Sequence, residues 1–317
     1  MTSPAISAII CTYERYDLLP RAIESLVQQS LPAMDFEILV VDNSPDHDFS
    51  QQFSLEYASV ANLTWLVERK SGLSNARNVG VDAAAAPLVA FMDDDAIASP
   101  RWLQSLIAAF QEFGANAQAA GGRVDPIWSS PRPRWLHDDL LGYVSVVNWG
   151  GQARFAAPTE WLAGTNIAFR RNALLEVGGF SVNFGRNQAG HALLSNDEVE
   201  VLARLRAGGG RALYVPDAAV QHLVAPERLT QEWFRRRVAW QAISEYLQNP
   251  KDLFGKASGY WGEVTRFFAK LPPQYRTPRG FYVEQDDPET FCAQLSAIYN
   301  FSIALMAGFH GVGEHVA

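Results

Sequence analysis

Three consecutive carboxylates end a short apolar run and are the residues whose types and spacing best suit chemistry. The run Leu88–Asp95 reads Leu-Val-Ala-Phe-Met-Asp-Asp-Asp, and its length is typical of a buried strand. Two acids ~4 Å apart repel each other by about 1 kcal/mol in water and by about 4 kcal/mol at an effective dielectric of 20. A hard divalent metal that holds a phosphate would relieve this repulsion. The alternative is a solvated loop in which one Asp caps a helix.

The elements around this run alternate between strand and helix, which predicts an α/β fold with a mainly parallel sheet and right-handed crossovers. Buried apolar runs predict further strands at Ala5–Cys11, Phe36–Val41, Leu63–Val67 and Ala117–Val124. Helical spacing of apolar residues or helix-start signals predict helices at Leu18–Gln29, Ser50–Tyr57, Ser74–Ala86 and from Ser99-Pro100 to about Phe113.

Polar residues follow the first two predicted strands at the sheet edge that also carries the three acids. Thr12 and Glu14 follow the first strand, and Asp42 follows the second. Ligands bind at this edge of open α/β sheets. Arg77 falls in the first turn of a predicted helix, against the helix dipole, and this placement favours a nearby anion. The alternatives are a turn residue for Asp42 and an ordinary surface arginine for Arg77.

The middle of the chain is less regular. Asp125–Thr159 is rich in Pro, Trp and Gly and is long for a loop, so it is either functional or disordered. Phe180–Ala192 reads as a mobile loop. Ser195 opens a predicted helix that runs to Arg206, with acids in its first turn. Two short strands, Ala212–Val215 and Ala219–Gln221, are predicted on either side of Pro216-Asp217 and lead to His222.

The last ninety residues read as helical. Thr230 caps a predicted helix that carries Arg235-Arg236-Arg237, and further helices are predicted at Leu253–Leu271 and Glu289–Met306. A basic amphipathic helix can lie on a membrane surface or bind an anionic lipid-linked acceptor, although a charge run is often only a solvated face. No uninterrupted apolar stretch predicts a membrane span with confidence.

Composition narrows the function classes. The chain has 317 residues with a formal net charge of −8, which gives no electrostatic case for binding nucleic acid. Its two cysteines, Cys11 and Cys292, offer neither a disulfide framework nor zinc-ligand spacing. The start of the sequence has no signal-peptide pattern. We therefore expect a cytoplasmic protein, with possible peripheral contact to the inner face of the membrane.

An ordered set of motifs resembles the family 2 glycosyltransferases of the GT-A type. The motifs are Cys-Thr-Tyr-Glu-Arg, Val-Val-Asp-Asn-Ser, Gly-Leu-Ser-Asn-Ala-Arg-Asn-Val-Gly, Phe-Met-Asp-Asp-Asp, Gly-Thr-Asn-Ile-Ala-Phe-Arg-Arg, Val-Gly-Gly-Phe, Asn-Asp-Glu-Val-Glu and Tyr-Val-Pro-Asp-Ala-Ala-Val-Gln-His. They span roughly residues 5–225. The resemblance implies inverting sugar transfer from a nucleoside diphosphate donor, usually with Mn²⁺ or Mg²⁺. It also implies a GT-A domain over 1–225, with a nucleotide-binding half at 1–124 and an acceptor-binding half at 125–225, before a helical extension at 226–317.

The same resemblance implies a role for each matched position. The nucleotide cleft would be lined by Thr12, Glu14, Asp42 as base reader, Arg77, Asp93 facing the ribose, and Asp94. The metal would be held by Asp95, with Asp93 and His222. The acceptor loop would contain Trp161, Gly164, Thr165 and Asn166. Glu198 matches the general base by position and Asp197 is the second candidate, because the acid pair is reversed relative to the family pattern.

Two other function classes stay open at this point. A nucleotidyltransferase shares the strand–helix opening and the acids, but it would carry a Gly-rich phosphate loop after the first strand, and Thr12-Tyr13-Glu14-Arg15 has no glycine. A non-catalytic sugar-binding relative is supported only by the reversed acid pair. For the glycosyltransferase we expect a UDP- or dTDP-linked sugar as donor. A glycan, a lipid-linked glycan or a small molecule would be the acceptor.

Overall fold

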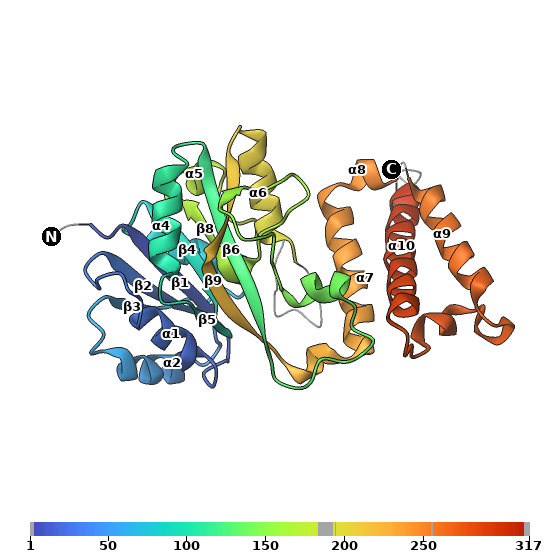
Figure 1. Ribbon diagram of the computed structural model, residues 1–317, viewed down its shortest axis with the longest axis horizontal. Coiled ribbons are helices and arrows are strands. Elements are labelled where there is room, and N and C mark those ends of the chain that lie inside the picture. The colour runs from blue at the N-terminus through green and yellow to red at the C-terminus, as the bar shows by residue number, and fades with distance from the viewer. Residues whose placement is uncertain (1–2, 183–192, 194, 255, 314–317) are drawn as a thin grey trace. The chain divides into compact units, whose positions relative to one another are not determined.

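The computed structural model describes residues 3–182, 193, 195–254 and 256–313, and it divides the chain into two compact units (Figure 1). The first unit comprises Met1–Ile127, Ser145–Gly190 and Asp197–Leu223. The second comprises Trp128–Val144, His191–Asn196 and Val224–Ala317. From residue 183 onward, the loop predicted over Phe180–Ala192 lies outside the described residues.

The first unit is built on a nine-stranded mixed sheet in the order β3-β2-β1-β4-β8-β6-β9-β5, with β7 paired to β9. The strands are β1 (Ile6–Thr12), β2 (Phe36–Asp42), β3 (Leu63–Val67), β4 (Leu88–Asp93), β5 (Ala96–Ala98), β6 (Ala117–Trp128), β7 (Arg154–Phe155), β8 (Ile167–Arg170) and β9 (Arg211–Val224). The first four pair in parallel, while β8 pairs antiparallel with both β4 and β6. The predicted α/β class is confirmed, and the parallel arrangement is confined to the first four strands.

Helices cover both faces of this sheet because its strands bury alternate residues on opposite sides. Ile6, Ala8 and Ile10 of β1 belong to a core shared with α1 and α4, whereas Ile9 belongs to a second core shared with α3, α5 and α6. The helices of the first unit are α1 (Leu19–Val27), α2 (His47–Ser54), α3 (Leu73–Ala83), α4 (Trp102–Glu112), α5 (Arg171–Glu176) and α6 (Asp197–Ala207), with the 3₁₀ turns η1 (Leu55–Tyr57) and η3 (Gly164–Asn166).

One prediction of strand boundaries is wrong. The two short strands expected on either side of Pro216-Asp217 are one continuous strand, β9. A Cβ atom on Gly122 of β6 would lie 1.8 Å from the carbonyl oxygen of Ala218, so only glycine allows this close approach beside the proline. The strand therefore passes Pro216 without ending, which local turn signals do not reveal.

The second unit is helical. It contains α7 (Gln231–Gln248), α8 (Pro250–Phe254), α9 (Ala257–Lys270), α10 (Pro288–Gly313) and the 3₁₀ turns η2 (Asp138–Val144), η4 (Pro226–Leu229), η5 (Pro273–Tyr275) and η6 (Pro278–Tyr282). The Thr230 cap is confirmed, since its Oγ1 accepts from the Trp233 N–H over 3.2 Å. The single helix predicted over Leu253–Leu271 is two helices, α8 and α9.

The basic run on α7 is not an open cationic surface. Arg235 is buried and donates to Gln294, Glu284 and Gln231 over 2.9–3.1 Å, so it joins the elements of the helical unit instead of facing a lipid. Residues Pro288–Gly308 of α10 are long and apolar enough to cross a membrane by length and composition alone, which is weak evidence. Phe291 and Leu295 of that helix are buried within the unit, as in a core helix.

Candidate functional site

The carboxyl ends of three strands meet at the predicted sheet edge. In the parallel register, Thr12 of β1 pairs with Asp42 of β2, and Cys11 of β1 pairs with Asp93 of β4. Open α/β sheets bind their ligands at such an edge. The predicted convergence of polar residues from β1, β2 and β4 is therefore confirmed.

The three acids occupy the end of β4 and the turn into β5. Thr12 Oγ1 donates to Asp94 Oδ2 over 2.7 Å, and Arg15 Nη2 lies 3.0 Å from Asp95 Oδ2. Burial and the charge of Asp95 raise the pKa of Asp94 to about 7. The cluster therefore carries fewer than three full negative charges near neutral pH, while Asp93 stays partly exposed at its open side.

A metal-binding group forms where β5 meets β9. Ala96 pairs with His222, so the imidazole is placed beside the acid turn. One ligand atom each from Asp93, Asp95 and His222 lies within 4.8 Å of the other two, and His222 Nε2 is 3.2 Å from Asp95 Oδ1. His222 Nδ1 is buried without a hydrogen-bond partner in the described part of the chain. Two carboxylates and an imidazole suit Mn²⁺, and the carboxylates suit Mg²⁺, so these residues could hold a metal.

Arg77 lies between the acids of β4 and those of α6. Its Nη1 is 2.5 Å from Asp197 Oδ2, and its Nη2 is 3.7 Å from Asp93 Oδ1. Its guanidinium lies over the ring of Phe180 at 5.3 Å from the centroid. A Cβ atom on Gly164 would lie 2.7 Å from Nη2, so the glycine makes room for the guanidinium. Arg77 is therefore buried and forms ion pairs with two acids, and its predicted place in the nucleotide cleft stays a prediction.

The two acids that open α6, Asp197 and Glu198, have pKa values shifted in opposite directions. Burial alone would raise the pKa of Asp197, but the ion pair with Arg77 outweighs it and holds that pKa below its usual range. Burial and the neighbouring charge of Asp197 raise the pKa of Glu198. Asp197 is thus a fixed anion, whereas Glu198 is the acid whose proton affinity suits general base chemistry near neutral pH.

Asp42 is held by three hydrogen bonds at the end of β2, and its role as base reader stays a prediction. Its side chain is 0 % exposed. Its Oδ2 accepts from Tyr16 over 2.8 Å and from Ser50 over 2.6 Å, while its Oδ1 accepts from the Ser44 N–H over 3.0 Å. The carboxylate therefore holds the walls of the site together. Glu14, by contrast, is exposed at the end of β1 with a left-handed backbone (φ 52°), anchored by its N–H to Ser44 Oγ.

The predicted acceptor loop is mainly a structural element. Asn166 is fully buried: its Oδ1 accepts from Trp102 Nε1 over 2.8 Å, and its Nδ2 donates to two main-chain carbonyls over 2.7 and 3.0 Å. The Asn166 amide therefore holds the loop in place, and the role of this loop on the acceptor side stays a prediction. Thr165 Oγ1 is buried without a hydrogen-bond partner among the described residues. Trp161 is half-buried and packs on the core.

Sequence reasoning placed Arg15 at this edge without giving it a role, and it missed Tyr16 and Ser50. Arg15 contacts the acid turn, and the two hydroxyl groups bind Asp42. Tyr16 could have been found from its place, four residues beyond the end of β1 at the predicted ligand edge. Nothing in the sequence pairs Ser50 with Asp42.

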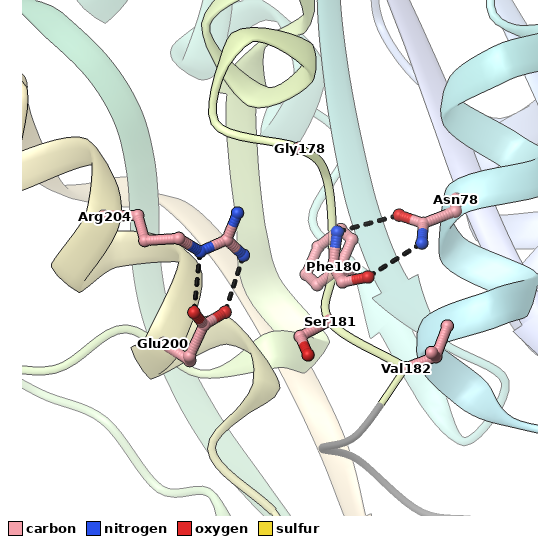
Figure 2. A pocket seen from close by; sticks show the side chains of 7 residues that line it. All are labelled: Asn78, Gly178, Phe180, Ser181, Val182, Glu200 and Arg204. Carbon is pink, nitrogen blue, oxygen red and sulfur yellow. Dashed lines mark hydrogen bonds and ion pairs between the residues drawn. The ribbon is translucent and has the colours of Figure 1, made fainter. Parts of the chain in front are cut away.

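A brace beside the acid pair explains the Val-Gly-Gly-Phe motif. Asn78 exchanges two 2.8 Å hydrogen bonds with the main chain of Phe180, and Arg204 binds Glu200 (Figure 2). Arg204 also donates to the carbonyl oxygen of Gly179. These bonds hold the Phe180 ring under Arg77. An open pocket lies over the brace, lined by Asn78, Gly178, Phe180, Ser181, Val182, Glu200 and Arg204. It includes none of the acids of the candidate site.

Comparisons with known proteins agree with this geometry. Residues 7–178 match the model of the family described as glycosyl transferase family 2. A glucosyl-dolichyl phosphate glucuronosyltransferase from Haloferax volcanii is 27% identical over 308 residues, covering 96% of this chain and 95% of that protein. A validoxylamine A glucosyltransferase from Streptomyces hygroscopicus is 33% identical over 207 residues, covering 57% of this chain and 48% of that protein.

Two solved structures share the fold. A mannosyltransferase from Pyrobaculum calidifontis in complex with GDP-Man and Mn²⁺ has a TM-score of 0.55 at 20% identity, covering 100% of this chain and 76% of that one. Residues 1–349 of TarS from S. aureus, in complex with UDP, have a TM-score of 0.53 at 18% identity, covering 95% of this chain and 90% of that one. At these identities the likeness concerns the fold alone.

Proposed function

Because the chain belongs to glycosyl transferase family 2, we propose that it moves a sugar, with inversion and with the help of a divalent metal, from a nucleoside diphosphate to a hydroxyl group of a lipid-linked glycan. The family and the named relatives make the chain a glycosyltransferase that uses a nucleotide-sugar donor. Neither the nucleotidyltransferase nor the non-catalytic alternative is therefore retained. The metal, the inversion and the acceptor are the proposed parts.

The division of roles between Asp197 and Glu198 carries the proposal. Inverting transfer needs one carboxylate free to accept a proton from the attacking hydroxyl group. Arg77 fixes Asp197 as an anion at 2.5 Å and leaves Glu198 with the raised pKa. The same guanidinium lies 3.7 Å from Asp93, so the base and the metal-binding acids belong to one connected group of charges.

In the proposed reaction, Glu198 takes the proton of the acceptor hydroxyl group as the oxygen attacks the anomeric carbon. The bond between that carbon and the diphosphate oxygen breaks, and the nucleoside diphosphate leaves with the electron pair. Asp93, Asp95 and His222 would hold Mn²⁺ or Mg²⁺, which when bound stabilises the charge on the leaving diphosphate as a Lewis acid. Arg77 keeps Asp197 ionised throughout, so Glu198 accepts the proton.

The proposed ligand-binding residues are those that the family motifs predict. The donor side would be lined by Thr12, Glu14, Asp42, Arg77, Asp93 and Asp94. The acceptor side would be lined by Trp161, Gly164, Thr165 and Asn166, where Gly164 leaves space for the Arg77 guanidinium. Asp42 would accept the N3–H of uracil or thymine, so we propose a UDP- or dTDP-linked sugar as the donor. The Haloferax volcanii relative, which matches almost the whole chain and is named for glucosyl-dolichyl phosphate, supports a lipid-linked acceptor.

We further propose that the reaction takes place in the cytoplasm, at the inner face of the membrane that carries the acceptor. The two free cysteines, Cys11 and Cys292, support a reducing compartment. Contact with the membrane would not use Arg235, which is buried in the helical unit.

The test is a donor and acceptor screen with the full chain. UDP-, dTDP- and GDP-sugars are each incubated with Mn²⁺ and a glucosyl polyprenyl phosphate, and nucleoside diphosphate release and the anomeric configuration of the product are measured. We expect release that depends on the acceptor, is abolished by EDTA, and gives the inverted anomer. Glu198→Gln should lower kcat by roughly 10²–10⁴-fold.

The matched control is Glu176→Gln, which changes an exposed acid at the end of α5 and should leave kcat unchanged. A product with retained configuration would contradict inversion. Full activity of Glu198→Gln would remove its role as base, and full activity in EDTA would remove the metal. Transfer to a polysaccharide end or a small molecule instead of the polyprenyl acceptor would refute the acceptor assignment.

A further inference from the structure

Arg15 is the second cation at the acid turn, and no role has been assigned to it. Its Nη2 lies 3.0 Å from Asp95 Oδ2, and its Nε lies 3.9 Å from Asp94 Oδ1. Arg77 contacts Asp93 on the other side of the cluster, with Nη2 at 3.7 Å from Oδ1. Two arginines thus contact the three acids of the turn.

The two arginines differ in their freedom to move. The side chain of Arg77 is 4% exposed and is bound by acids from two elements, whereas that of Arg15 is 33% exposed. Asp95 itself is buried, at 4% side-chain exposure, so its charge needs a cation beside it, and a bound metal ion can take the place of Arg15. Arg15 is therefore the cation that can leave the acid turn without disturbing the core.

Asp95 offers its oxygens to two protein groups at once. Its Oδ1 faces His222 Nε2 at 3.2 Å, and its Oδ2 faces Arg15 at 3.0 Å. A divalent cation bound by Asp93, Asp95 and His222 must share this carboxylate with the guanidinium. Like charges brought this close repel, so the cation and Arg15 compete for Asp95.

We propose that Arg15 is an exchangeable counter-ion that holds Asp95 before the metal binds and then transfers to the diphosphate of the donor. The identity of the anion rests on the proposed function, whereas the competition with the metal does not. A guanidinium forms paired hydrogen bonds with phosphate oxygens as readily as with a carboxylate, so the transfer exchanges one favourable partner for another.

This exchange makes metal and diphosphate bind cooperatively. A metal ion that binds without a diphosphate must displace Arg15 from Asp95, and the displaced guanidinium then has no new anion to bind. The metal ion alone therefore binds weakly. With a diphosphate present, the displaced guanidinium gains a partner, and each ligand strengthens the other by the same factor. Arg15 would then delay tight metal binding until the donor arrives.

The test measures Mn²⁺ binding to the full chain by calorimetry and by the electron paramagnetic resonance signal of free Mn²⁺. Arg15→Met should bind Mn²⁺ alone about tenfold more tightly than the unchanged protein, which corresponds to about 1.4 kcal/mol. Arg15→Lys keeps the charge and should give a smaller gain. Arg123→Met, which breaks an exposed pair with Asp125, is the matched control and should change nothing. Unchanged or weaker Mn²⁺ binding in Arg15→Met would overturn the proposal.

A second arm uses UDP and GDP at saturating Mn²⁺. Arg15→Met should weaken the binding of whichever nucleotide the unchanged protein takes by about tenfold, and equal affinity in both proteins would overturn the transfer to the diphosphate. Mn²⁺ binding that survives Asp95→Asn would lie elsewhere and would overturn the competition. If no sugar is transferred but the Mn²⁺ affinities follow the expected order, the proposed function fails and the competition stands. Thermal unfolding of each variant checks that it folds.

Discussion

At the scale of single residues, the candidate site is governed by how charges are shared between neighbouring acids. Asp197 and Glu198 are adjacent in the sequence, yet Arg77 contacts only Asp197 at 2.5 Å. The reversed order of the pair therefore follows a physical logic: the shorter acid is held by the arginine, and the longer acid keeps its proton affinity and its reach. Asp42 illustrates the opposite case, because three donors share the charge of its carboxylate.

The raised pKa of Glu198 leads to a pH prediction. A base must be deprotonated, so kcat should rise with pH through the ionisation of Glu198, at a pH above that of an ordinary glutamate, because burial and Asp197 raise its pKa. Asp197→Asn should shift this rise to lower pH, because it removes the negative charge that raises the pKa of Glu198. The positive charge of Arg77 is then no longer offset by Asp197 and lowers that pKa further. The measurement is kcat against pH at saturating donor and Mn²⁺. A rise at the same pH in both proteins would contradict the assignment.

At the scale of elements, the segment after α5 and the helix α6 are joined by side chains that fix main-chain atoms. Gly178 and Gly179 both have left-handed backbones, with φ of 89° and 69°. The turn that they make brings Phe180 to Asn78, whose amide group binds both the N–H and the carbonyl oxygen of Phe180. The brace therefore fixes the ring against which Arg77 lies, and Arg77 in turn holds Asp197.

Alanine at each of these two glycines distinguishes strain from crowding. Each substitution places a side chain in the left-handed region, at a cost of about 1–2 kcal/mol. A Cβ on Gly178 meets only Arg204 at 3.8 Å, whereas one on Gly179 would lie 2.7 Å from Asn78 Oδ1. Gly179→Ala should therefore cost more, by about 1–2 kcal/mol, because Asn78 must move and its bonds to Phe180 weaken. Urea unfolding gives the free energy of unfolding of both variants. Equal losses would mean that Asn78 can move without lowering the stability.

The elements that sequence predicts correctly are those whose signals are local. The buried runs of β1, β2 and β4 each end in a polar residue, so both the strands and the ligand edge follow from the chain itself. The Thr230 cap and the acids that open α6 are local in the same way. These signals were enough to predict where the candidate site lies.

The features that sequence could not predict depend on distant partners. The burial of Asp42 is set by hydroxyl groups from Tyr16 and Ser50, which lie on other elements. The continuity of β9 through Pro216 depends on Gly122 in β6, and the insertion of β8 between β4 and β6 depends on antiparallel pairings that periodicity does not encode. Sequence therefore predicted which edge is functional better than what each side chain does there.

At the scale of the whole molecule, the chain does not divide at a single boundary near residue 225. The helical unit also takes Trp128–Val144 and His191–Asn196, so the sheet unit is interrupted twice. Within the helical unit, Gln241 Nε2 binds Asn196 Oδ1 over 3.1 Å and Glu245 Oε1 over 2.7 Å. Segments distant in sequence are thus held to α7 by polar side chains, and Arg235, the first of the three arginines, belongs to the same pattern.

The final prediction separates a structural role of this run from a membrane-binding role. Arg235→Met removes a buried guanidinium that donates to Gln294, Gln231 and a main-chain carbonyl oxygen. Because these buried acceptors lose a charged donor, the free energy of unfolding of the helical unit should fall by roughly 2–4 kcal/mol. Lys251→Met, at an exposed lysine of α8, should change it by less than about 0.5 kcal/mol. Urea unfolding followed by circular dichroism gives both values, and binding to anionic vesicles is measured alongside. Equal stability of the two variants, with vesicle binding lost in Arg235→Met, would contradict the structural role of Arg235 and would support its contact with a membrane.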